Sequence, residues 1–277
     1  MLLLALDTST RQASVALCSE DALHGEYTWY AGNNHSVELL GHIQRLLAEC
    51  GKTMRDIDGV AVATGPGSFN GLRVALATAK ALAFALKKPI AGVCTLDIIA
   101  AQQQQWRGPI CSLLEAGRSE LYAACYIFDE VHSDSGDVTY RMKRLSDYLL
   151  LPPQQISSYL QEQRSAWVGI PGERKLPSFL FCGEMSAESR QVLRAHMQEK
   201  SLFVSSVSAT RHGSVLAMLA MQRLHDGKGD DPLLLEPLYL RRPSITTSTR
   251  KQPLLGGKSN RPTGPGKTER EEGALRH

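Results

Sequence analysis

The chain of 277 residues runs through one order of elements twice, and this repetition constrains its fold more than any other feature. In the first half, short apolar runs separated by turn residues predict three consecutive strands at 2–6, 13–18 and 23–30. Helical and extended patterns then alternate. They predict, in order, helix 35–50, strand 59–64, helix 71–87, strand 90–94 and helix 95–105.

The second half repeats this order. LLEAGRSELYAACYIF (113–128) resembles LLALDTSTRQASVALC (3–18), since each has an apolar strand, an acidic residue, a polar turn and a second strand. After an irregular polar stretch at 129–150, we expect helix 154–164, strand 178–182, helix 186–198, strand 202–207 and helix 214–226. The duplication predicts two stacked α/β halves with mixed sheets, divided as 1–108 and 109–243.

The C-terminal segment 244–277 differs in composition from the rest. It is rich in Gly, Pro, Ser and Thr. It has seven Lys or Arg against three Asp or Glu, so its net charge is +4, whereas the net charge of the whole chain is +3. We expect a disordered basic tail. Residues 1–243 have a net charge of −1. If the protein binds RNA, the tail or a partner must therefore supply most of the positive charge.

Cysteine usage and hydropathy point to a cytoplasmic protein. The six cysteines never form C-x-x-C, and most lie in apolar segments, as reduced packing residues do. MLLLALD has no basic flank ahead of its short apolar run, and no apolar stretch approaches 18 residues. We therefore expect neither secretion nor a membrane span.

The stretch GPGSFNGLR (65–73) joins a strand to a helix through three glycines. Such a corner can cradle an anion, because glycine lets backbone N–H groups approach a phosphate at the positive end of a helix dipole. The stretch lacks the Lys-Ser/Thr of a Walker A loop, and Gly71 is at the wrong interval for the dinucleotide fingerprint. A tight turn fits the same residues.

The helix that follows, 71–87, is apolar around most of its circumference. Arg73, Lys80 and Lys87 form one narrow basic stripe, and Thr78 is the only other polar side chain between Leu72 and Leu86. Such a helix needs cover on two sides. Burial within one domain is one interpretation, and docking of one face on another protein is the interpretation that we favour.

Acidic residues end corresponding strands in the two halves, Asp7 before T-S-T in the first and Glu115 in the second. Together with Thr8 and Ser9 they could hold hydrated Mg²⁺ and a phosphate. Equally, Asp7 could cap its own turn. No third acid for a two-metal nuclease, no H-x-x-x-H or H-E-x-x-H pair and no G-x-S-x-G is found, so we expect no metal site and no catalytic residues.

Several stretches resemble the bacterial tRNA threonylcarbamoyladenosine biosynthesis protein TsaB, also called YeaZ. They are LALDTST (4–10), HSVELL (35–40), GVAVATGPGSFNGLRVALATAKALA (59–83), EAGRSELY (115–122) and EPLYLR (236–241). GPGSF-x-GLR is the specific one. The resemblance implies two RNase H-like lobes of the actin-like, sugar-kinase and heat-shock ATPase type.

The resemblance also implies a non-catalytic subunit. Its partner would be TsaD, which moves a threonylcarbamoyl group from an adenylate to N6 of the tRNA adenosine adjacent to the anticodon, with the ATPase TsaE joining the pair. Contact with tRNA would come through the complex, and the free chain could form a homodimer. No cofactor would be tightly bound, although ATP or ADP could lie at an interface of the complex.

By the same resemblance, the first two helices form the dimer surface. The residues we expect there are His35, Leu39, Ile43, Phe69, Leu72, Arg73, Val74, Ala77, Lys80 and Ala81. A nucleotide or phosphate would meet Asp7, Thr8, Ser9, Gly65, Gly67 and Ser68. The chain departs from the family at Asn70, where many members have Thr, and at Glu115, which replaces Asp. An ATP-dependent kinase of the same fold is the main alternative, and a metalloprotease is a third.

Overall fold

The computed structural model describes residues 1–32, 34–132, 138–167 and 178–241. Met1–Arg242 form one compact unit. The expected disordered tail at 244–277 lies outside the described residues.

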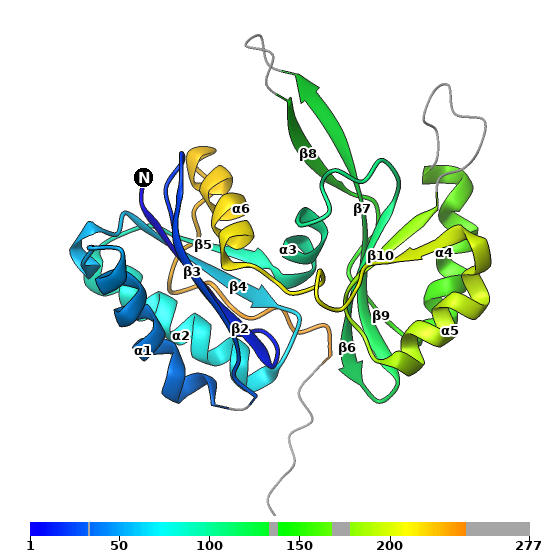
Figure 1. The fold of residues 1–277 in the computed structure, drawn as a ribbon, viewed down its shortest axis with the longest axis horizontal. Coiled ribbons are helices and arrows are strands. Elements are labelled where there is room, and N and C mark those ends of the chain that lie inside the picture. The colour runs from blue at the N-terminus through cyan, green and yellow to red at the C-terminus, as the bar shows by residue number, and fades with distance from the viewer. Residues whose placement is uncertain (33, 133–137, 168–177, 242–277) are drawn as a thin grey trace, which may run out of the picture. The chain divides into compact units, whose positions relative to one another are not determined.

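The first sheet joins a meander to a parallel pair (Figure 1). Its strands are β1 (Leu3–Asp7), β2 (Gln12–Cys18), β3 (Leu23–Tyr30), β4 (Gly59–Gly65) and β5 (Ile90–Cys94), in the spatial order β3-β2-β1-β4-β5. The meander β1-β2-β3 is antiparallel, whereas β4 runs parallel to both β1 and β5.

The second sheet repeats this arrangement. Its strands are β6 (Ile110–Gly117), β7 (Glu120–His132), β8 (Val138–Arg144), β10 (Phe179–Glu184) and β11 (Ser201–Phe203), in the order β11-β10-β6-β7-β8, and β9 (Leu149–Leu151) pairs with β7. The central strand β6 is antiparallel to β7 and parallel to β10, as β1 is to β2 and β4. The expected α/β fold class, with two mixed sheets of the same strand arrangement, is confirmed.

The expectation of an irregular stretch at 129–150 is wrong. β7 continues to His132, and β8 pairs with it antiparallel along the edge of the sheet. Tyr140 and Met142 of β8 are half-buried, whereas Arg141 and Lys143 are exposed. Because one face of this edge strand carries charged side chains, its composition resembles that of a loop.

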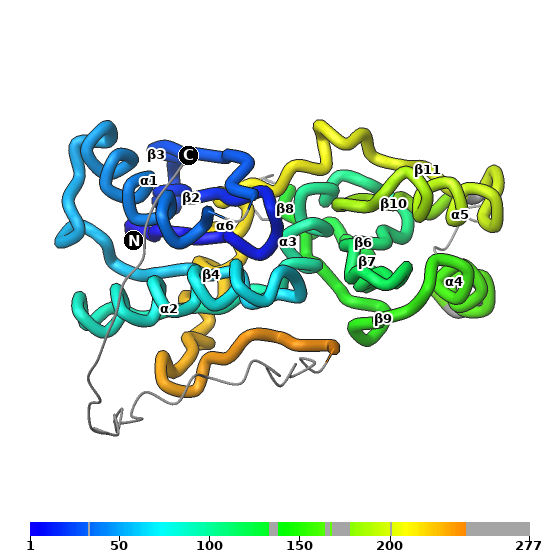
Figure 2. The backbone as a smooth tube through the Cα atoms, turned by 90° about the horizontal axis from the view of Figure 1, so that it is seen from below, coloured from blue at the N-terminus to red at the C-terminus, as the bar shows by residue number. Residues whose placement is uncertain are grey.

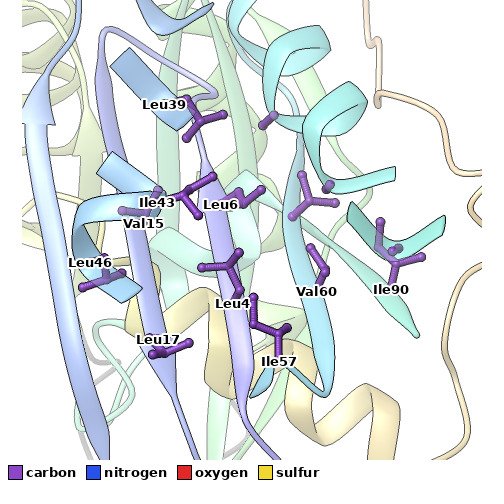
Figure 3. Packing of buried hydrophobic residues seen from close by; sticks show 14 of the residues in the cluster. Leu4, Leu6, Val15, Leu17, Leu39, Ile43, Leu46, Ile57, Val60 and Ile90 are labelled. Carbon is purple, nitrogen blue, oxygen red and sulfur yellow. The ribbon is translucent and has the colours of Figure 1, made fainter. Parts of the chain in front are cut away.

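Helices cover both faces of the first sheet. α1 (His35–Glu49) and α2 (Phe69–Leu86) pack on the face that Leu4 and Leu6 point toward (Figure 3). α6 (Gly213–His225) covers the opposite face, where Leu3 and Ala5 lie. Successive strand residues point to opposite faces, so an unbroken apolar strand such as β1 requires cover on both.

The second sheet is covered in the same way. α4 (Pro153–Trp167) and α5 (Ala187–Met197) pack on the face that includes Leu113 and Phe181. α3 (Thr95–Ala101) covers the face that includes Ile110 and Leu114. Two 3-10 turns, η1 (Met54–Asp56) and η2 (Gln198–Lys200), complete the described elements.

The two sheets exchange one helix each. α3 directly follows β5 of the first sheet but packs on the second, and α6 follows β11 of the second sheet but packs on the first (Figure 1). This exchange differs from the linear division into 1–108 and 109–243. In each sheet, two helices cover one apolar face and leave the other uncovered. The exchanged helix buries that second face.

Candidate functional site

The glycine-rich corner after β4 closes on the backbone of the β1–β2 turn. A Cβ atom on Gly67 would lie 2.1 Å from the carbonyl oxygen of Ser9, and one on Gly71 would lie 2.0 Å from that of Thr8. The N–H of Ser68 donates to the same Ser9 oxygen at 2.6 Å. The hydroxyl of Thr8 donates to Gly71 O at 2.7 Å. The glycines are therefore required for contact between two backbone segments.

The corner also starts α2. Ser68 is the N-cap residue, and its hydroxyl accepts a hydrogen bond from Gly71 N at 3.3 Å. Gly65 has a φ of 104°, which a side chain rarely adopts, and a Cβ there would lie 2.9 Å from Leu72. Of the two interpretations of this stretch, the tight turn matches the geometry, because Gly67 and Gly71 pack against the carbonyls of Ser9 and Thr8 and the N–H of Ser68 is bonded to Ser9.

Asp7 is fully engaged by its own chain. Its Oδ1 accepts the N–H of Ser9 at 2.8 Å and the hydroxyl of Ser9 at 2.6 Å. Its Oδ2 accepts Nε of Arg211 at 2.8 Å, and both of these side chains are buried. The expected cap of the turn is thus present, together with a buried ion pair that leaves Asp7 no free oxygen facing solvent.

Arg211 was not among the expected site residues. It lies between β11 and α6, is 1% exposed, and its guanidinium also pairs with Glu184 at the end of β10. Its Nη2 donates to Thr10 Oγ1 at 2.9 Å and to Gln12 O at 3.0 Å. Since Asp7 is 204 positions away in the sequence, no local pattern could have joined the two residues.

Glu115, the counterpart of Asp7 in the second sheet, is exposed. Its carboxylate accepts the N–H of Ser186 at 2.7 Å, and Ser186 is the N-cap of α5. An acid near a helix N-terminus is favoured by the helix dipole. Glu115 and Asp7 therefore both act within the chain's own framework.

A cavity of about 830 Å³ lies between the strand ends of the two sheets. Thr10, Gly67 and Ser68 line it from the first sheet, and Glu115 and Glu184 line it from the second. Of the residues expected at a nucleotide, Gly67 and Ser68 reach the cavity, whereas Asp7, Thr8 and Ser9 are buried. Within the described ranges, no three His, Cys, Asp or Glu side chains come together as metal ligands.

The exposed row of α2 is the second candidate site. Phe69, Arg73, Ala77, Ala81 and Phe84 follow one another at helical spacing, and all are exposed. Phe84 is 79% exposed, although it is a large apolar side chain. We call these five residues the α2 face. Exposed apolar surface of this kind is typical of a contact with another molecule.

Four of the ten expected interface residues are buried. His35, Leu39, Ile43 and Leu72 are each at most 4% exposed, and Leu39 and Ile43 belong to the core of the first sheet. Leu72 belongs to the inward row of α2, which sequence periodicity does not distinguish from the outward row because both are apolar. The other three belong to the inward row of α1, which is amphipathic. Burial also lowers the pKa of His35. On α1 the exposed apolar side chains are instead Val37 and Leu40.

The other six expected interface residues remain accessible. Phe69, Arg73, Ala77 and Ala81 are exposed, and Val74 and Lys80 are half-buried. The guanidinium of Arg73 lies 5.2 Å from the ring centre of Phe69, and the ring of Phe69 lies 5.5 Å from that of Tyr239. Figure 2 shows the segment that carries Tyr239, in orange, beside α2. A role of these six residues in an interface remains a prediction.

By length and composition, α2 also qualifies as a candidate membrane span. It has 18 residues and a mean hydropathy of 1.3, whereas we expected no apolar stretch of that length. A helix packed on a sheet passes the same test. Leu72, Ala75 and Leu76 belong to the buried row of α2, and 33% of the apolar window is buried.

The family model described as "TsaD: tRNA N6-adenosine threonylcarbamoyltransferase" matches residues 29–248. Among curated relatives, the tRNA threonylcarbamoyladenosine biosynthesis protein TsaB of Bacillus subtilis is 28% identical, with 87% of this chain and 94% of the relative covered. TsaB of Haemophilus influenzae is 32% identical, with 60% and 71% covered.

A solved structure of YeaZ from Pseudomonas aeruginosa is similar in fold and sequence. It superposes with a TM-score of 0.65 at 26% identity and covers 86% of this chain and 99% of its own. The curated relatives and the family model both point to tRNA threonylcarbamoyladenosine biosynthesis. The chain belongs to the TsaB (YeaZ) family of tRNA threonylcarbamoyladenosine biosynthesis proteins, within the wider group that the TsaD model describes.

Proposed function

We propose that the chain is a non-catalytic subunit of the cytoplasmic machinery for tRNA threonylcarbamoyladenosine biosynthesis. It binds the catalytic subunit TsaD as a heterodimer, and TsaD transfers the threonylcarbamoyl group from its adenylate to N6 of the tRNA adenosine adjacent to the anticodon. The names of its relatives support the pathway. The α2 face supports the docking role, because it is the exposed apolar surface of the helix that follows the family's specific motif.

The composition of the α2 face suits close packing against a second helix. Ala77 and Ala81 have small side chains, so a partner backbone can approach α2 between the two phenylalanines. Phe69 and Arg73 are residue types enriched at the centres of interfaces. The same face would let the free chain pair with itself when TsaD is absent.

Further partners would join through this heterodimer. We propose that the ATPase TsaE binds the assembled pair and that tRNA meets the chain through the complex. ATP or ADP would bind where the subunits meet and not tightly to the free chain, because Asp7 is already held by Ser9 and Arg211.

An ATP-dependent kinase of the same fold is the second candidate, favoured by the cavity between the sheets. The acidic residues that a kinase would need argue against this function. The carboxylates of Asp7 and Glu115 both accept hydrogen bonds from the chain itself, so a nucleotide-bound metal would have to displace those bonds. Turnover of Mg-ATP by the purified chain alone would favour the kinase.

The docking role is tested with Ala77→Arg, which places a long cation in the middle of the α2 face. We expect the affinity for TsaD to fall by about 2 kcal/mol, or ~30-fold, as at a central interface position. The matched control is Ala195→Arg, since Ala195 is also an exposed helical alanine but lies on α5. Titration calorimetry with TsaD gives both affinities. Equal affinities for the two variants would overturn the proposed docking face.

A further inference from the structure

Arg211 joins the two sheets at their strand ends. Its Nε holds Asp7 at the end of β1, and its Nη1 pairs with Glu184 at the end of β10. The hydroxyl of Thr10 donates to Glu184 as well, at 3.1 Å, so the β1–β2 turn of the first sheet contacts this carboxylate directly. These bonds lie next to the cavity, which Thr10 and Glu184 line.

The backbone that carries Arg211 is held on both sides by one side chain. The Nε2 of Gln102 donates to Thr210 O at 3.0 Å, and its Oε1 accepts the N–H of His212 at 2.9 Å. Gln102 directly follows α3, the helix that crosses from the first sheet to the second. One amide therefore fixes the residues before and after Arg211.

From Asp7 the bonds continue to the start of α2. Asp7 accepts the N–H and the hydroxyl of Ser9, and the carbonyl of Ser9 accepts the N–H of Ser68 at 2.6 Å. Ser68 caps α2, whose first residue is Phe69 of the α2 face. A continuous set of hydrogen bonds thus runs from Glu184 through Arg211 to the helix proposed to dock.

We propose that Arg211, Asp7 and Glu184 form a permanent clasp between the two sheets and that Arg211 is a positioning residue for the α2 face. The clasp sets the closure of the cavity without a ligand, because a buried guanidinium with four acceptors already links the strand ends of the two sheets. The part of the proposal that concerns docking rests on the proposed function.

The clasp is tested on the full-length chain with two variants. Glu184→Gln removes the charge pair with the second sheet only and keeps Asp7 paired. Asp7→Asn combined with Arg211→Met removes both buried charges together, so that neither is left unpaired to prevent folding. Arg55→Met is the matched control, since it makes the same substitution at an exposed arginine outside the clasp. Arg55 precedes β4, whereas the glycine-rich corner follows β4.

Hydrogen exchange of the free chain is the first measurement. We expect residues 182–186 to exchange about 10-fold faster in Glu184→Gln, because the variant removes one charge partner of the buried Arg211 guanidinium at this strand end. In the double variant we expect residues 66–72 to accelerate as well, and in Arg55→Met neither segment to change. Unchanged exchange of both segments in the double variant would overturn the clasp.

Affinity for TsaD is the second measurement. We expect the double variant to bind about 10-fold more weakly, since the start of α2 is no longer fixed. Faster exchange at 66–72 with unchanged affinity would overturn the positioning role of Arg211. Ala77→Arg in the same assay separates the two proposals: if it weakens binding while the clasp variants behave as the parent, the docking face stands and the clasp is wrong.

Discussion

The N–H of Ser68 donates to the carbonyl oxygen of Ser9 at 2.6 Å, and this bond closes the glycine-rich corner on the chain's own backbone. In other proteins, a corner of this composition at a helix start can bind a phosphate. Here the N–H of Ser68 and the space beside Gly67 and Gly71 are taken by the turn after β1. The glycine-rich corner thus builds the start of a helix whose outer face is apolar and exposed.

The corner glycines should not tolerate alanine. We expect Gly67→Ala and Gly71→Ala each to lower the free energy of unfolding by about 3 kcal/mol, the upper range for overpacking, because the new Cβ would meet a backbone carbonyl that cannot turn away. Gly41→Ala is the control: no atom lies within 4 Å of its Cβ position. Urea unfolding measures all three, and a corner variant as stable as the parent would contradict the packing described.

The repetition of elements in the sequence was enough to predict the two mixed sheets, because apolar strands and their turns follow local rules. The exchange of α3 and α6 was not predictable from the same patterns. A helix such as Gly213–His225 has an apolar face that fits either sheet, and which sheet it covers depends on contacts with β1 and β2, about 200 positions away.

The site was predictable to a smaller extent. Sequence identified α2 as a helix with too much apolar surface for one contact, and Phe69 and Ala77 are exposed as expected. It could not separate them from Leu72, since a helix that is apolar all round shows no inward row. Arg211 carried no local signal, because its partners are Asp7 and Glu184 from two different sheets.

Asp97 on α3 should make stability depend on pH. Burial raises its pKa above the ordinary 3.8, opposed by hydrogen bonds from the hydroxyls of Tyr126 and Tyr148. The folded state then binds more protons than the unfolded state above pH 3.8, so this group costs stability as the pH rises through its raised pKa. Relative to the parent, Asp97→Asn should therefore gain free energy of unfolding as the pH rises.

Asp56 should give stability the opposite dependence on pH. Hydrogen bonds from Thr53 lower its pKa, so its carboxylate contributes stability above the unfolded pKa that is lost as the pH falls. Asp56→Asn should lose stability relative to the parent as the pH rises. Urea unfolding from acidic to neutral pH measures both, and parallel curves for the two variants would refute these assignments.

The thiols should differ sharply in reactivity. Cys50 is half-buried, whereas the other five cysteines are buried. Burial raises the pKa of Cys18 to about 11 and that of Cys94 to about 12, so neither forms the reactive thiolate at mild pH. A thiol reagent should label one site rapidly in the folded chain, and Cys50→Ser should abolish that phase. A rapid phase that survives in this variant would disagree with the burial described.

Nucleotide should leave the free chain unchanged. Because Arg211 already neutralises Asp7, we expect millimolar Mg-ATP to cause no shift in the melting temperature, whereas a ligand that binds the folded state would raise it. The variant Asp7→Asn with Arg211→Met serves as a comparison, since it removes the clasp from the edge of the cavity. A saturable rise in the melting temperature of the parent would favour the kinase.

The proposed function requires that the chain meets its partner through the outer row of α2. Hydrogen exchange of the full-length chain, measured alone and bound to TsaD, tests this contact. We predict that exchange slows on binding across residues 69–85, which include Phe69, Ala77 and Phe84, while α5 is unaffected. Slowing confined to α5 or to the residues that line the cavity, with α2 unchanged, would contradict the proposed contact.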